Sequence, residues 1–151
     1  MQEMAIDQTL IVKIFMAVFC GFVLGLERQI RGKPVGIRTS ILICMGTMLF
    51  IFLGAHVNEG KDATRILGQI VTGVGFLGAG VIMNREGLIS GVTSAAIVWL
   101  LAGIGASIGF GFYSTASLIT FLALLILVGI QYLEKGFKEL RRGVHKHIRG
   151  D

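Results

Sequence analysis

A chain of 151 residues has the length of one domain, but its composition excludes an ordinary soluble globular protein. Hydrophobic residues make up 54% of the chain and charged residues 15%, and the mean hydropathy is +0.79. This composition predicts that lipid surrounds most of the folded chain. Cys20 and Cys44 both lie in long apolar stretches, where a disulfide framework has no use, so we interpret them as packing residues.

Long stretches with few or no charged residues predict the transmembrane helices. Four such stretches follow one another along the chain, with Lys13 as the only charge inside them: 8–26, 39–55, 66–84 and 87–133. A bilayer core needs about 20 apolar residues per helix, so each of the first three stretches holds one span. The fourth is long enough for two, and Gly109, Gly111 and Ser114 supply the break near its middle.

The predicted fold class is therefore all-α, a polytopic membrane protein with five transmembrane helices. Long apolar runs without alternation exclude a closed barrel, and acidic Glu3 and Asp7 before the first helix argue against a cleaved signal peptide. We divide the chain into a membrane domain, 1–133, and a basic amphipathic tail, 134–151. The helices are expected at 9–26, 38–56, 65–83, 92–110 and 114–133.

Basic residues predict the orientation of these helices. Five spans place the loops at 27–37 and 84–91 and the C-terminal tail on one side of the membrane. That side holds all but three of the 14 Lys and Arg residues; the other side holds Lys13, Lys61 and Arg65. The positive-inside rule therefore places the N-terminus outside and the tail in the cytoplasm. The basic tail is expected to lie along the anionic inner leaflet.

Many of the 22 glycines lie within the predicted helices. Helices in lipid associate through close contacts that small side chains permit, so these glycines predict packing faces. We expect the third and fourth helices to form the tightly packed centre, against each other or across a dimer. An ion path lined by glycine is the alternative. The packing candidates are Gly21, Gly25, Gly68, Gly73, Gly75, Gly78, Gly80, Gly105 and Gly109.

A charged turn after the first helix supplies the first candidate polar site. Polar residues near spans are candidates because their burial in lipid is costly without a partner. Glu27 can pair with Arg31, one helical turn on, or with Arg38 at the start of the second helix. These residues form either a charged collar that anchors two helices or a polar site at the cytoplasmic mouth of the bundle. The candidates are Glu27, Arg28, Arg31, Arg38 and Thr39.

Further polar candidates flank the third and fourth helices. Asp62 is expected to cap the third helix, followed by Arg65. Gln69 lies one turn further into the span, where its amide can bond a neighbouring helix or a permeating ion. At the fourth helix, Ser90 or Thr93 is expected to be the cap, and we add Thr93 to the polar candidates.

The sequence shows no residue pattern that is typical of catalysis or metal binding. His56 lies at a helix end, and His145 and His147 lie in the tail, without the ligand spacing of a zinc site. The run GVGFLG at 73–78 matches a dinucleotide-binding pattern, but it lies within a predicted span and no strand precedes it. We therefore expect no enzyme activity, no cofactor, no metal and no nucleic-acid partner.

Three stretches of this sequence resemble the MgtC/SapB family of bacterial membrane proteins. They occur in the order and near the spacing of that family and cover most of residues 21–110. The sequence departs from the family at Val35, where alanine is expected, and at Thr93, where MgtC-like members have asparagine. The stretches are GLER with GIRT at 25–28 and 36–39, DATRILGQIVTGVGFLGAGVI at 62–82, and GVTSAAIVW at 91–99.

The resemblance implies a five-span domain in the bacterial inner membrane, with its N-terminus outside. Longer members add a soluble cytoplasmic domain after this core, and we expect the short form here. The resemblance also implies links to magnesium limitation and to virulence inside host cells. In some members it implies restraint of ATP synthase, which makes that complex a candidate partner.

Three functions agree with these features. We favour a regulator that contacts another membrane complex, because the helices offer small-residue faces and carry no acidic residue in mid-span. The alternative is a cation transporter or channel that uses Glu27, Asp62 and Gln69, although Mg²⁺ requires several oxygen ligands and usually keeps its waters. The third is a structural homodimer.

Overall fold

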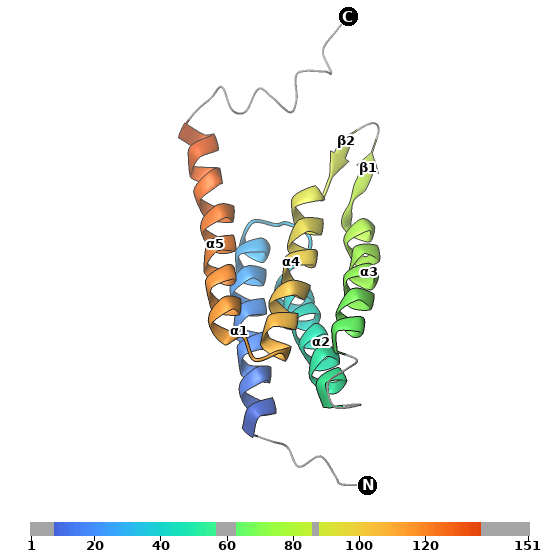
Figure 1. Ribbon diagram of the computed structural model, residues 1–151. Helices are drawn as coiled ribbons and strands as arrows, with labels where there is room; N and C mark the ends of the chain where they lie inside the picture. Colours follow the sequence, from blue (N-terminus) through green and yellow to red (C-terminus); the bar gives the residue numbers. More distant parts are fainter. Residues whose placement is uncertain (1–7, 57–62, 86–87, 137–151) are drawn as a thin grey trace, which may run out of the picture.

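The computed structural model describes residues 8–56, 63–85 and 88–136, and helices dominate this part of the chain (Figure 1). The helices run roughly side by side, and a short hairpin interrupts their order. In chain order the elements are α1 (Gln8–Ile30), α2 (Ile37–His56), α3 (Ala63–Val81), β1 (Met83–Arg85), β2 (Leu88–Ser90), α4 (Val92–Gly109) and α5 (Tyr113–Gly136).

The predicted fold class, an all-α membrane protein, is confirmed. Four helices are long and apolar enough to cross a membrane: α1, α2, α4 and the Tyr113–Ile130 part of α5. The apolar part of α3, Arg65–Val81, is shorter. The orientation in the membrane and the division at residue 133 remain predictions. The last helix runs on to Gly136, and the tail residues 137–151 lie outside the described part of the chain.

The first helix ends later than its predicted boundary at residue 26. It continues to Ile30, so Glu27 and Arg28 belong to its last turns and not to a loop. The prediction took the first charged residues as the end of the helix, whereas charge ends only the apolar stretch. The turn comes at Gly32, whose φ of +60° is left-handed, and the Lys33 N–H donates to the Arg28 carbonyl at 3.0 Å.

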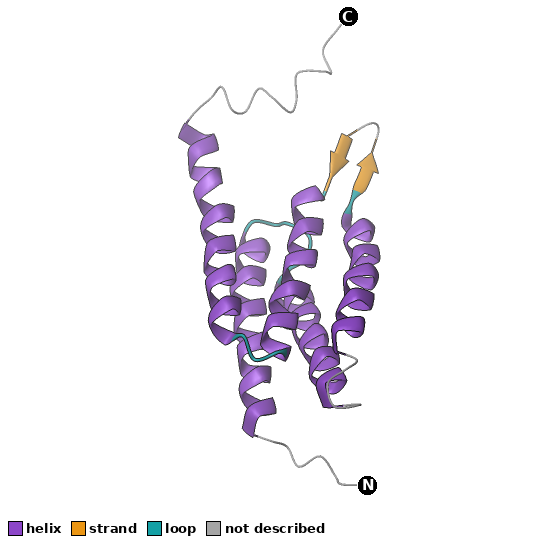
Figure 2. Ribbon diagram, viewed as in Figure 1, coloured by secondary structure: helices purple, strands orange, loops and turns teal. Residues whose placement is uncertain are grey.

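A two-stranded hairpin that the sequence analysis did not predict joins α3 to α4 (Figure 2). Its strands pair antiparallel, with Met83 opposite Ser90. Strands this short carry too little alternation to be recognised in a sequence. The hairpin leads into Gly91, whose φ is +89° and where a Cβ would collide with the carbonyl oxygen of Val81. Glycine is therefore required at this position.

Glycine contacts bring α2 close to both α1 and α4. On α1, Gly21 and Gly25 meet the first half of α2, and a Cβ on Gly21 would lie 2.7 Å from Cα of Ile41. On α4, Gly105 meets α2 at Cys44 and Thr47, and Gly109 meets it at Met48 and Ile51, with as little space. Because a real Cβ essentially never approaches other atoms so closely, the helix backbones are in direct contact at these four positions.

The third helix lies at the edge of the bundle, beside α4 (Figure 1). A Cβ on Gly78 would lie 3.5 Å from the carbonyl oxygen of Ala95, which is ordinary van der Waals contact. Within one chain, α3 therefore meets α4 through Gly78, whereas packing across a dimer stays a prediction. Apart from the backbone of α3 itself, no described atom lies within 4 Å of a Cβ built on Gly68, Gly73, Gly75 or Gly80.

We expect Gly105→Ala to lower the thermal stability of the purified protein, whereas Gly103→Ala does not. Both glycines lie on α4, but a Cβ at 105 collides with the Cys44 carbonyl and a Cβ at 103 meets open space. Overpacking of this kind costs about 1–3 kcal/mol, while alanine in an open helix position gains up to about 1 kcal/mol over glycine. Circular dichroism melting in detergent measures the difference. Equal melting temperatures for the two variants would contradict the α2–α4 contact.

Candidate functional site

One carboxylate holds two arginines at the end of α1. The Arg28 Nε–H donates to Oε2 of Glu27 at 2.5 Å, and the Nη2–H donates to Oε1 at 3.0 Å. One helical turn on, the Nε of Arg31 lies 2.5 Å from the same Oε1. Glu27 and Arg28 are buried, and Arg31 is partly exposed. Of the two partners predicted for Glu27, Arg31 is the one found.

This Glu27 cluster depends on the unexpected length of α1. Residues four apart share a face only while the helix continues, and α1 continues through Glu27 to Ile30. Because two guanidinium groups meet one carboxylate, the cluster carries a net positive charge. The structure leaves Arg38 exposed at the start of α2, outside this cluster.

A cavity of about 800 Å³ lies beside the Glu27 cluster, at the end of the bundle that the charge count assigns to the cytoplasm. The end of α1 and the following turn, the hairpin, the start of α4 and the far part of α5 all contribute to its wall. Thr93, one of the predicted polar residues, belongs to it, whereas Lys33 and Ser94 were not selected from the sequence. The polar lining residues are Arg28, Lys33, Ser90, Thr93 and Ser94.

The N-terminus of α4 lies at this cavity. The predicted cap by Ser90 or Thr93 is wrong, because the N-cap residue is Gly91 and no side chain caps the helix. The first N–H groups of a helix have no acceptor within it. Ser94, in the same turn, is 2% exposed, and no hydrogen bond joins its hydroxyl to another described residue. The cavity therefore offers backbone and hydroxyl donors together with basic side chains.

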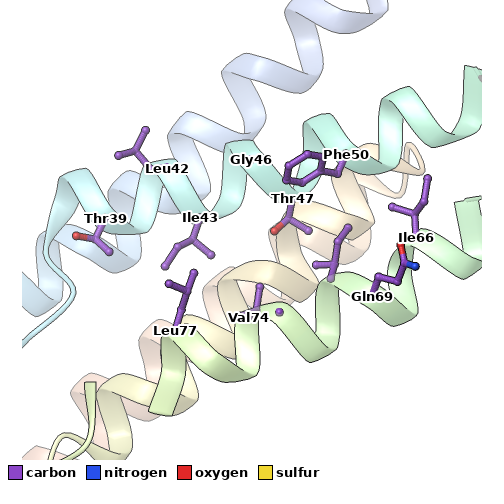
Figure 3. A pocket seen from close by; sticks show the side chains of 12 residues that line it. Thr39, Leu42, Ile43, Gly46, Thr47, Phe50, Ile66, Gln69, Val74 and Leu77 are labelled. Atoms are coloured by element: carbon purple, nitrogen blue, oxygen red, sulfur yellow. The ribbon is translucent and has the colours of Figure 1, made fainter. Parts of the chain in front are cut away.

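A second hollow of about 600 Å³ separates α2 from α3 (Figure 3). We call it the α2–α3 groove. Ile43 and Thr47 of α2 point toward Leu77 and Val74 of α3, and most of the lining is apolar. Thr39 and Gln69 also line this groove and are exposed. The structure thus brings these two predicted polar residues to the α2–α3 groove and not to the Glu27 cluster.

At the opposite end of the bundle, the structure adds a polar residue that was not selected from the sequence. Lys13 is buried, and its Nζ donates to the carbonyl of Gly109 at 2.6 Å. The same Nζ lies 5.0 Å from the centroid of the Phe52 ring. The C-terminal end of α4 carries partial negative charge, which favours a cation there. A single lysine inside an apolar helix is the signal that could have identified it.

The remaining candidates lie apart from these sites. Arg65 is exposed at the start of α3, and Asp62 lies outside the described residues. Cys20 and Cys44 are buried and free. In residues 8–56, 63–85 and 88–136, no group of three His, Cys, Asp or Glu side chains could hold a metal ion.

We expect Glu27→Gln to destabilise the protein, because the change leaves the buried Arg28 guanidinium without its counter-charge. Breaking a buried ion pair by removing one partner costs about 3 kcal/mol or more. The control is Arg38→Gln, which removes an exposed charge at the same end of the bundle and should change stability by less than about 0.5 kcal/mol. Thermal unfolding of both variants in the same detergent makes the comparison. A Glu27→Gln variant as stable as Arg38→Gln would contradict the ion-pair cluster.

Comparison with known proteins identifies relatives in several bacteria. The chain is 42% identical to a protein of Escherichia coli (strain K12) described as putative magnesium transporter YhiD, over 89% of this chain and 65% of that protein. It is 39% identical to protein SapB of Bacillus subtilis (strain 168), over 85% of this chain and 58% of that protein. It is 35% identical to protein MgtC of Brucella abortus (strain 2308), over 84% of this chain and 54% of that protein.

The match to these relatives covers most of this chain but only part of theirs. The chain spans between 54 and 65% of the length of the three proteins. No solved structure matches it. Residues 14–136, which include the Glu27 cluster, the cavity and the α2–α3 groove, match the MgtC family. The three sequence stretches that resembled this family are thereby explained, and the chain belongs to the MgtC family.

Proposed function

We propose that this protein is a regulator in the bacterial inner membrane that acts by binding a second membrane protein through α3. The observation that carries the proposal is the open face of α3, defined by Gly68, Thr72, Gly75 and Ala79. All four residues are exposed, and the Thr72 hydroxyl donates to the Gly68 carbonyl within its own helix. The face therefore presents only small side chains, and its one hydroxyl is already hydrogen-bonded within the helix.

Such a face is better suited to a helix than to lipid. Lipid is as apolar as leucine, so helices in a membrane gain contact mainly where small residues let two backbones approach. The glycines of α1 and α4 make these contacts within the chain, whereas Gly68 and Gly75 meet open space. The large exposed side chain of Phe76, beside Gly75, offers a further contact for a partner.

The partner we propose is a helix of an integral membrane complex. The family resemblance makes ATP synthase one candidate, and a second copy of this chain is another. The description of the E. coli relative as a putative magnesium transporter supports a link to magnesium homeostasis. In this proposal, the protein responds to magnesium limitation by changing the activity of its partner and performs no chemistry itself.

Transport of a cation ranks second. Glu27, near the end of α1, is an acidic residue that a transported cation would use. Two arginines already bind its carboxylate. A magnesium ion needs several oxygen ligands, and a carboxylate neutralised in this way is a poor one. The relative described as a putative magnesium transporter is the observation that keeps this function as a candidate.

Affinity capture from native membranes in mild detergent, followed by mass spectrometry, tests the α3 proposal. Gly75→Leu fills the open face and should reduce capture of the membrane partner at least about tenfold, because the backbones can no longer approach. The matched control is Gly129→Leu, which adds the same side chain to open space on α5. Unchanged capture by Gly75→Leu, with both variants melting like the wild type, would rule out the proposed surface.

The same experiment separates the third function from the first. Copies of the chain with two different tags show whether the captured partner is the protein itself. Recovery of a second copy and no other membrane protein, lost in Gly75→Leu, would favour the structural homodimer over the regulator.

Magnesium flux into vesicles that contain the purified protein tests transport. We expect flux no greater than in empty vesicles, because the residues of the described chain offer no set of free carboxylates. Flux above that background, kept in Arg38→Gln and abolished in a Glu27→Gln variant that a melting curve shows to be folded, would place transport ahead of regulation.

A further inference from the structure

The cavity beside the Glu27 cluster combines positive charge, uncapped hydrogen-bond donors and an apolar wall. We propose that it binds the phosphate headgroup of an anionic membrane lipid. This inference rests on residues of α1 and the turn after it, of α4 and of α5, and it is independent of the open face of α3.

The basic side chains of the cavity can still donate to an anion. Arg28 and Lys33 line it, and its described lining contains no acidic residue. Glu27 accepts from Nε and Nη2 of Arg28. A guanidinium has five N–H donors, so the remaining ones are available to a ligand. Lys33 is exposed and adds a mobile charge at the rim.

The start of α4 supplies the second part of the site. The uncapped N-terminus carries partial positive charge and N–H groups that point along the helix axis, which suits a phosphate. Ser94 lines the cavity and is 2% exposed, yet its hydroxyl bonds no other described residue. No buried side-chain oxygen or nitrogen of the described residues lacks a hydrogen-bond partner, so the Ser94 oxygen is reached from the cavity and is not sealed in the core. Its O–H can therefore donate to an anionic oxygen in the cavity.

The wall formed by α5 selects a lipid over a free phosphate ion. Leu127 is buried, while Ile126 is 58% and Ile130 49% exposed. The wall therefore continues from the cavity onto the outer face of the bundle, which meets the bilayer. A volume of about 800 Å³ lies in the range of about 300–1,000 Å³ that small-molecule sites occupy. A phosphodiester on the polar side and acyl chains along α5 use both halves of the site.

Native mass spectrometry of the full chain, purified in a neutral detergent, tests the proposal with phosphatidylglycerol, phosphatidylcholine and inorganic phosphate as probes. The test variant is Lys33→Gln with Ser94→Ala, and Ser94→Ala alone is the second variant. The control is Arg38→Gln, which removes an exposed charge at the same end of the bundle but not from the cavity. Melting curves without added lipid verify that all variants are folded.

We expect one phosphatidylglycerol to bind in preference to phosphatidylcholine, with an affinity about tenfold lower in the double variant and unchanged in Arg38→Gln. Ser94→Ala alone should weaken binding by a smaller factor. Equal binding by the wild type and the double variant would overturn the proposal, as would an equal loss in Arg38→Gln. If inorganic phosphate displaces the lipid and shows the same dependence on Lys33 and Ser94, the ligand is soluble phosphate and the lipid assignment is wrong.

Discussion

The close approach of α2 to both α1 and α4 is the constraint on which the rest of the structure depends. Lipid supplies no hydrophobic force between helices, so direct backbone contact has to hold them together. Gly25 on one side of α2 and Gly105 on the other leave no room for a Cβ. These contacts fix the position of α1 relative to α4 along the axis of the bundle. Arg28 at the end of α1 therefore lines the same cavity as the start of α4, and the polar cavity follows from that alignment.

Apolar runs in the sequence predict the helices and their order, because charges and glycines mark where each run ends. They do not predict which face of a helix is buried. Gly75 and Gly105 lie in similar small-residue patterns, yet one is open and the other touches α2. The polar residues show the same limit. Glu27 and Gln69 are both near span ends in the sequence, but tertiary packing buries Glu27 in an ion-pair cluster and places Gln69 in the α2–α3 groove. The cap of α4 could not be predicted because the hairpin before it was not recognised.

The open face of α3 and the cavity beside the Glu27 cluster are formed by different residues. The open face of α3 belongs to a helix at the edge, where a partner can approach without disturbing the contacts of α2. The cavity lies between the end of α1, the hairpin, the start of α4 and α5, and Glu27 holds Arg28 in its wall. Both lie within residues 14–136, the region that matches the family. A partner bound at the open face of α3 would therefore leave the glycine contacts of α2 unchanged.

The contact between Lys13 and Gly109 has a consequence for how the protein is made. Lys13 belongs to α1, but the Gly109 carbonyl to which its Nζ donates lies 96 residues later in the chain. A lysine at the centre of a helix costs about 3 kcal/mol to insert, and less near the ends. The bond can therefore form only after α4 has been synthesised. A lysine buried in the first half of the chain thus obtains this acceptor from the second half.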